Sequence, residues 1–208
     1  METWDLVAAE RNDLADLLET LSEQQWNTET LCDGWKVRDL TGHLVEGAEK
    51  LRWGRLIGAM VKSGFRINVM LDRGAREMGT LPTPDLLKRM RESAGYQFTA
   101  PGVKPVGALA ENVTHSQDIR RPLGKPREIP DETLRLSLDY MAAQGASFMP
   151  NKKRIAGLKL QATDLDWTHG DGPVVTGSGE ALLMAIAGRK AALADLGGEG
   201  KDTLASRL

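Results

Sequence analysis

The sequence predicts a mainly α-helical protein, a helical bundle followed by a small C-terminal α+β unit. Up to residue 150, apolar side chains recur at three- and four-residue steps, which is the spacing of amphipathic helices that bury one stripe. After Pro150 the pattern alternates as in strands, and helical spacing then returns. We therefore expect a bundle over residues 1–150 and an α+β unit over residues 151–208 that packs against it.

The N-terminal helices follow from periodicity and capping. A periodic run predicts a helix over residues 3–21, and Ser22 with Gln25 forms a capping box for a short turn. Another helix should start near Trp35, and His43 falls on its apolar stripe, so His43 should point into the bundle. The residues of that stripe are Val37, Leu40, Leu44, Gly47 and Leu51.

Prolines mark the starts of the later helices. In Thr83-Pro84-Asp85 the threonine should cap a helix that runs to about residue 98. A helix over residues 106–121 follows Pro105, and Pro130 opens a further helix that ends near residue 144.

The C-terminal segment combines strand and helix patterns. Residues 155–162 and 165–169 read as strands, turn residues follow, and Val174 begins a third strand. We expect these strands to form a small antiparallel sheet. Residues 179–196 return to helical spacing.

Composition narrows the class of partner to a small molecule. The chain has 208 residues with 27 basic and 29 acidic side chains and no block of like charge, so it predicts no nucleic-acid and no membrane partner. The N-terminus lacks the pattern of a signal peptide, and Lys62 and Arg66 interrupt the most apolar later stretch, so we expect a cytoplasmic protein. Cys32 is the only cysteine, which excludes an internal disulfide; we expect it to be buried beside Trp35 rather than to act as a nucleophile.

Two histidines and a glutamate form a candidate metal site. Glu111 and His115 stand four residues apart on one predicted helix, so both side chains leave the same face. His43 could supply a third ligand from a facing helix, which leaves a coordination position open, as in catalytic zinc sites. The alternatives are a core histidine at position 43 and a solvated pair at positions 111 and 115.

Two further polar residues are considered as members of the site, one close to His115 in sequence and one in the C-terminal segment. Asp118 is three residues beyond His115, where its carboxylate could orient the imidazole through the second ring nitrogen or pair with nearby arginines. His169 has no partner at an informative spacing and is expected to serve packing or the surface.

The segments TLCDGWKVRDLTGHL and ENVTHSQDIRRPLG together resemble the mycothiol-dependent maleylpyruvate isomerase family of actinobacteria, within the DinB-like metalloprotein superfamily. The segment VVTGSGEALLMAIAGRKAALADL is similar to the C-terminal unit of that family. The resemblance implies a DinB-like four-helix bundle that holds a divalent metal, usually zinc, through His43, Glu111 and His115. It also implies mycothiol as cosubstrate, and it matches Arg189 to an arginine that could pair with a substrate carboxylate.

The leading hypothesis is an enzyme, an isomerase or a thiol transferase, in which the metal activates mycothiol for addition to a small electrophilic substrate. No separate catalytic base is identifiable. A metal-dependent hydrolase and a noncatalytic metal- or ligand-binding module remain alternatives, and a homodimer is left open.

Overall fold

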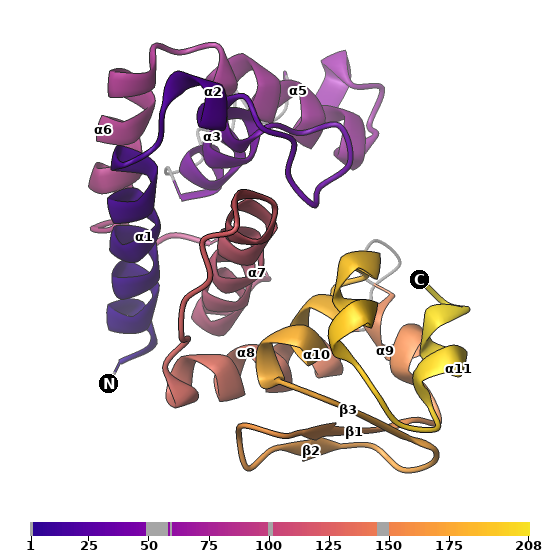
Figure 1. Cartoon of the computed structure of the whole chain (residues 1–208). Coiled ribbons are helices and arrows are strands. Elements are labelled where there is room, and N and C mark those ends of the chain that lie inside the picture. Colours follow the sequence, from indigo (N-terminus) through magenta and orange to yellow (C-terminus); the bar gives the residue numbers. More distant parts are fainter. Residues whose placement is uncertain (1, 49–57, 59, 100–101, 145–149) are drawn as a thin grey trace. The chain divides into compact units, whose positions relative to one another are not determined.

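The computed structural model describes residues 2–48, 58, 60–99, 102–144 and 150–208. Contacts divide the chain into two compact units, residues 1–126 and residues 127–208. This division lies earlier in the chain than the expected domain boundary at residue 150, which stays a prediction. The structure is mainly helical with a small sheet, as the sequence predicts (Figure 1).

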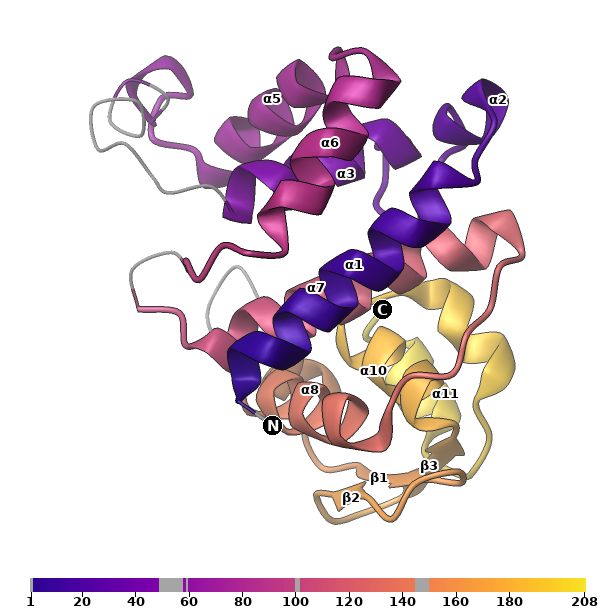
Figure 2. The same ribbon diagram turned by 90° about the vertical axis from the view of Figure 1, so that its left-hand side faces the viewer.

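The first unit is a bundle of helices that positions the candidate site. Its helices are α1 (Thr3–Glu19), α2 (Glu23–Trp26), α3 (Val37–Ala48), α5 (Ile67–Gly79), α6 (Thr83–Ser93) and α7 (Pro105–Leu123). Helix α1 packs against α6 and α7, and α3 packs against α5, α6 and α7 (Figures 1 and 2). The bundle therefore brings α3 and α7 together although they lie far apart in sequence.

Apolar stripes of these helices form one core. Leu14 and Leu18 of α1 and Leu40 and Leu44 of α3 are buried in it, as their periodicity predicts, and Trp26 is buried beside them. Leu51 of the predicted stripe lies outside the described residues. Gly47 was expected on the same inward stripe but is exposed, so the buried stripe is shorter than predicted. The capping box also forms, because Ser22 Oγ accepts from the Gln25 amide and the Gln25 side chain accepts from the Ser22 amide.

Helices α3 and α5 approach closely at Gly42, the residue before His43. A Cβ atom at Gly42 would lie 2.8 Å from the Ala75 carbonyl oxygen and 2.9 Å from Met78 Cβ. Real Cβ atoms essentially never show contacts this short, so a side chain here would force the helices apart. The missing side chain therefore sets how α5 lies beside the segment that carries His43.

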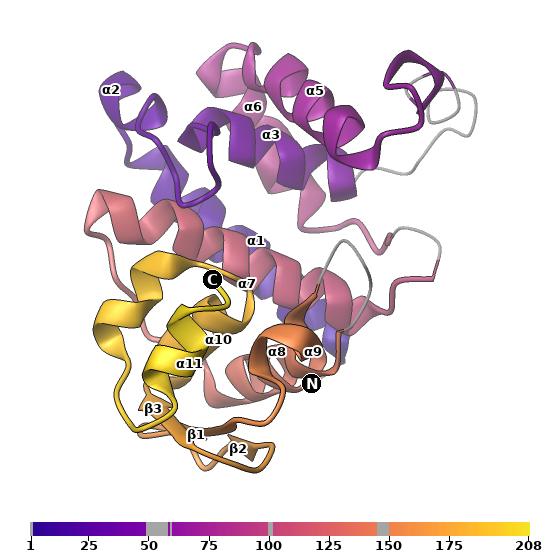
Figure 3. The same ribbon diagram turned by 90° about the vertical axis from the view of Figure 1, so that its right-hand side faces the viewer.

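The second unit packs helices on a small sheet. It contains α8 (Asp131–Ala143), α9 (Asn151–Ile155), β1 (Lys159–Ala162), β2 (Thr168–His169), β3 (Val174–Gly177), α10 (Gly179–Ile186), the 3₁₀ helix η1 (Lys190–Asp195) and α11 (Lys201–Ala205). Helix α10 packs against α8 and contacts β1 and β3, so it lies over the sheet (Figure 3).

The relative direction of the paired strands differs from the prediction. The strand order is β2-β1-β3, and β1 pairs antiparallel with β2 but parallel with β3. The predicted all-antiparallel sheet is therefore wrong. Alternation of apolar residues indicates which face of a strand is buried, but it carries no information about strand direction.

Several element boundaries also differ. The strand expected over residues 155–162 begins only at Lys159, and the run over residues 179–196 is broken at Gly188, which has φ of 93°. Thr83 does not cap α6, because Pro82 occupies the cap position. The helix ends at Ser93, earlier than the predicted end near residue 98. Helix α5 was not predicted.

Within the described part of the chain, no helix combines the length and the apolar character that crossing a membrane requires.

Candidate metal centre

The structure brings the three predicted ligands together inside the first unit. His43 comes from α3, and Glu111 and His115 come from α7, one turn apart. One ligand atom of each lies within 4.8 Å of the others. His43 Nε2 is 3.4 Å from Glu111 Oε1, and the two imidazole rings lie edge to face with centroids 5.3 Å apart. Their role as metal ligands stays a prediction, but the geometry that it requires is present.

Glu111 is the most accessible of the three. Its side chain is 44% exposed, whereas that of His43 is 12% exposed. The surrounding protein still desolvates the carboxylate, which raises its pKa, but the hydrogen bond with His43 and the charges of His115 and Arg11 outweigh this effect. The pKa of Glu111 therefore lies below its ordinary value, and near neutral pH the group is a carboxylate that can bind a cation.

Arg11 is a neighbour of this site that no sequence pattern singles out. It is buried on α1, where its guanidinium donates to the carbonyl oxygens of Ser93 at 2.7 Å and Tyr96 at 2.9 Å. Burial lowers the pKa of Arg11, and the charge of Glu111 opposes that shift. Helical periodicity predicts burial for apolar residues, so it could not predict a buried cation.

Asp118 occupies the position expected for an orienting carboxylate. It is fully buried, and its Oδ2 lies 2.9 Å from Nδ1 of His115. A carboxylate is an acceptor, so this contact selects the His115 tautomer with a proton on Nδ1 and leaves Nε2 free to bind a metal. The orienting role stays a prediction that this geometry supports.

Cys32 lies beside both Asp118 and His115. Its thiol donates to Asp118 Oδ2 at 3.1 Å and lies 3.7 Å from His115 Nδ1. The sequence suggested a buried residue beside Trp35, whereas Cys32 is only partly buried and contacts polar groups. No spacing rule connects residues that are 86 positions apart, so this contact could not be predicted.

Trp35 covers the side of His43. The two ring centroids are 5.1 Å apart with a tilt of 45°, and the indole N–H of Trp35 donates to Asp72 Oδ1 at 2.9 Å. This hydrogen bond is the main reason that the pKa of Asp72 lies below its ordinary value. Arg76 adds to the effect from the next turn of α5.

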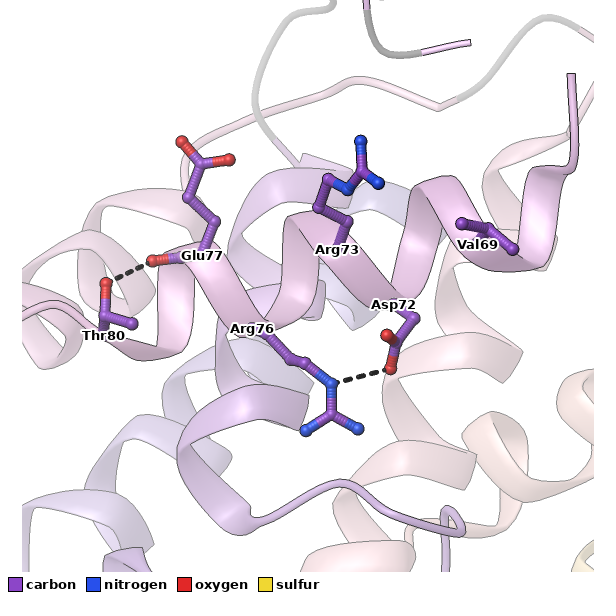
Figure 4. A pocket seen from close by; sticks show the side chains of 6 residues that line it. All are labelled: Val69, Asp72, Arg73, Arg76, Glu77 and Thr80. Atoms are coloured by element: carbon purple, nitrogen blue, oxygen red, sulfur yellow. Dashed lines mark hydrogen bonds and ion pairs between the residues drawn. The ribbon is translucent and has the colours of Figure 1, made fainter. Parts of the chain in front are cut away.

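Asp72 and Arg76 also line a groove on α5. In Figure 4 the Arg76 side chain reaches toward the carboxylate of Asp72. The groove contains polar and charged side chains for the most part, and its lining residues are Val69, Asp72, Arg73, Arg76, Glu77 and Thr80. Its chemistry differs from that of the three-ligand cluster.

The remaining predicted positions lie in the second unit. His169 is an exposed residue of β2, stacked on Trp167 with ring centroids 6.0 Å apart. Arg189 follows α10, and its guanidinium donates to the Ala187 carbonyl at 3.1 Å. Its contact with a substrate carboxylate stays a prediction.

The donor set fits a divalent metal ion. Two imidazoles and one carboxylate are ligands of catalytic zinc sites, and such sites keep one position for water or substrate. The same donors also suit other divalent transition metals. Asp118 contacts Nδ1 of His115, so Nε2 is the nitrogen that would bind a metal, and the metal would displace a proton held there. The ionised Glu111 supplies the anionic donor.

Comparisons with known proteins identify the fold and the family of the chain. Two crystal structures of mycothiol-dependent maleylpyruvate isomerase share the fold. One, a histidine-to-alanine variant, is 16% identical with a TM-score of 0.63, and the other is 14% identical with a TM-score of 0.57. Each match covers 96% of this chain and 92% of the solved chain. No curated protein sequence matches the chain. The sequence profile of the mycothiol maleylpyruvate isomerase N-terminal domain matches residues 7–117, more than half of the 208 residues, and the chain therefore belongs to this family.

Proposed function

We propose that the chain is a divalent-metal-dependent enzyme that uses mycothiol to isomerise a small electrophilic substrate or to transfer the thiol to it. The observation that carries the proposal is the convergence of His43, Glu111 and His115, whose ligand atoms lie within 4.8 Å of one another. Family membership supports mycothiol as the thiol. Zinc is the preferred metal, because the donor set matches catalytic zinc sites.

The chain's own residues prepare this site. Asp118 holds the proton of His115 on Nδ1, and the lowered pKa of Glu111 keeps its carboxylate ionised. When bound, the metal supplies a Lewis acid that favours the thiolate form of a coordinated thiol. With two neutral imidazoles and one carboxylate as ligands, the donor set leaves a net positive charge at the centre, which favours an anionic partner. Arg11 adds to that positive charge through its interaction with Glu111.

An open coordination position separates this proposal from a purely structural metal site. Structural zinc sites have four protein ligands. Among the described residues, the cluster around His43 contains three ligand residues, and Asp118 faces the opposite nitrogen of His115. This count favours a catalytic role over the noncatalytic module. An open position also suits water activation, so hydrolysis remains the second reaction to test.

The test begins with elemental analysis of protein purified without an affinity tag. We expect about one divalent metal per chain in the wild type and in His169→Ala, and little in His43→Ala, because His43 belongs to the cluster and His169 does not. His169→Ala is the matched control, since it removes an imidazole from the second unit. Equal metal content in all three proteins would reject the site.

Calorimetric titration with mycothiol then tests the reaction class. We expect mycothiol to bind the metal-loaded wild type and not His43→Ala. Thiol adducts or isomerised product should form from small electrophiles, while turnover of esters or amides without a thiol would point to hydrolysis. Full thiol-transfer activity in metal-free protein would contradict the proposal.

A further inference from the structure

The two histidines of the cluster are held in different ways. His115 is oriented through Nδ1 by the buried carboxylate of Asp118. For His43, the polar contact that the described residues provide is with Glu111, which is itself a proposed ligand. Metal-binding imidazoles are usually oriented through the nitrogen that does not bind the metal. The ring of His43 therefore needs another source of orientation.

Trp35 provides a surface against which the His43 ring can rest. The centroid distance of 5.1 Å and the tilt of 45° lie in the range of favourable aromatic pairs. The indole can restrain the imidazole only if its own rotation is fixed. Its N–H is bound to Asp72 Oδ1 at 2.9 Å, which fixes the plane of the indole.

Helix α5 holds Trp35 through its side chain and Gly34, the residue before it, through its backbone. Asp72 accepts from the indole and from Arg76 Nε at 3.0 Å. Arg76 also donates to the carbonyl oxygen of Gly34 at 2.8 Å, so it binds the backbone of the residue before Trp35. Asp72 and Arg76 thus connect the outer face of α5 with the loop that covers His43.

We propose that Trp35 is a positioning residue for His43, and that Asp72 and Arg76 act on the metal centre through Trp35. This inference rests on the proposed metal site. The side chains of Asp72 and Arg76 are 48% and 51% exposed and line the groove in Figure 4, so their replacement opens no cavity in the core. A substitution on the surface of α5 should therefore weaken metal binding without a matching loss of stability.

The experiment measures zinc affinity, by competition with a chelating dye, for the wild type and three variants of the full chain. Trp35→Phe keeps a ring but loses the N–H, Asp72→Ala removes the acceptor, and Asp72→Asn keeps an acceptor oxygen. We expect the first two to lose ~10-fold or more in affinity, as for other groups that orient metal ligands, and Asp72→Asn to stay close to the wild type.

The second unit offers a matched control, and the midpoint of thermal unfolding provides a second measurement. Trp167 donates to Asp139 at 2.8 Å and stacks on His169, so Asp139→Ala removes the same kind of contact in the other unit. Asp139→Ala should bind zinc as the wild type does, and the metal-free Asp72→Ala protein should keep its unfolding midpoint.

The outcomes separate this inference from the proposed function. If the wild type binds no divalent metal, the metal centre and this inference both fail. If the wild type binds zinc and Trp35→Phe and Asp72→Ala bind it equally well, the positioning role alone is overturned. Weaker binding that accompanies an equal drop in the unfolding midpoint of the metal-free protein would also overturn it, because the effect would then be one of general stability.

Discussion

Individual residues at this site act through short chains of contacts. Asp118 illustrates this, because one buried carboxylate oxygen lies at hydrogen-bonding distance from His115 at 2.9 Å and accepts from Cys32 at 3.1 Å. The spacing of His115 and Asp118 on one helix made the first contact predictable. The second joins a loop to α7 across 86 positions, and only the folded chain reveals it.

Replacement of Asp118 should weaken metal binding more than replacement of Cys32. Asp118→Ala removes the acceptor that selects the tautomer of His115, so we expect zinc affinity to fall by about 10- to 100-fold. Cys32→Ser keeps a donor toward Asp118 and should bind zinc like the wild type. Dye competition measures both affinities, and circular dichroism checks that each variant is folded. Wild-type affinity in Asp118→Ala would show that Asp118 does not orient the ligand.

At the scale of helices and strands, sequence patterns predicted α3 and α7, which carry the proposed ligands. They were less successful for α5 and for the sheet. Glu111 and His115 share a face of α7 because they are four residues apart, and His43 lies on the apolar stripe of α3. Helix α5 and the parallel pairing of β1 with β3 were missed, because α5 contributes few buried apolar residues and alternation does not encode strand direction. The predictable part is therefore the convergence of the three proposed ligands, and the unpredictable part is the contact of α5 with Trp35.

The close approach of α3 and α5 can be tested with two glycines of the same helix. A Cβ atom at Gly42 would collide with Ala75 and Met78, whereas one at Gly47 meets nothing within 4 Å. We expect Gly42→Ala to lower the free energy of unfolding by about 1–3 kcal/mol, as overpacking does. Gly47→Ala should raise it by about 0.5–1 kcal/mol, because alanine is the better helix former. Urea unfolding measures both, and equal effects would contradict the close contact.

For the whole molecule, the proposed metal centre links two stretches that are far apart in the chain. His43 belongs to α3 and the other two proposed ligands belong to α7, so a metal ion would cross-link the first unit between these helices. The donors are already close together, and the core of this unit consists of buried apolar side chains. The fold should therefore survive without the metal, in contrast to small zinc domains that unfold when the metal is removed.

Chelation should consequently destabilise the protein without unfolding it. Free metal at 100 times its dissociation constant stabilises a protein by about 2.7 kcal/mol, and for a chain of this size that shift corresponds to ~5–10 °C in unfolding midpoint. We expect a chelator to lower the calorimetric midpoint by about this amount while the helical circular dichroism signal at 25 °C is retained. The shift should shrink as the pH falls, because protons compete with the metal for the imidazoles. His169→Ala should show the same shift as the wild type and His43→Ala none. Complete loss of helical signal on chelation would instead identify the metal as a structural element of the fold.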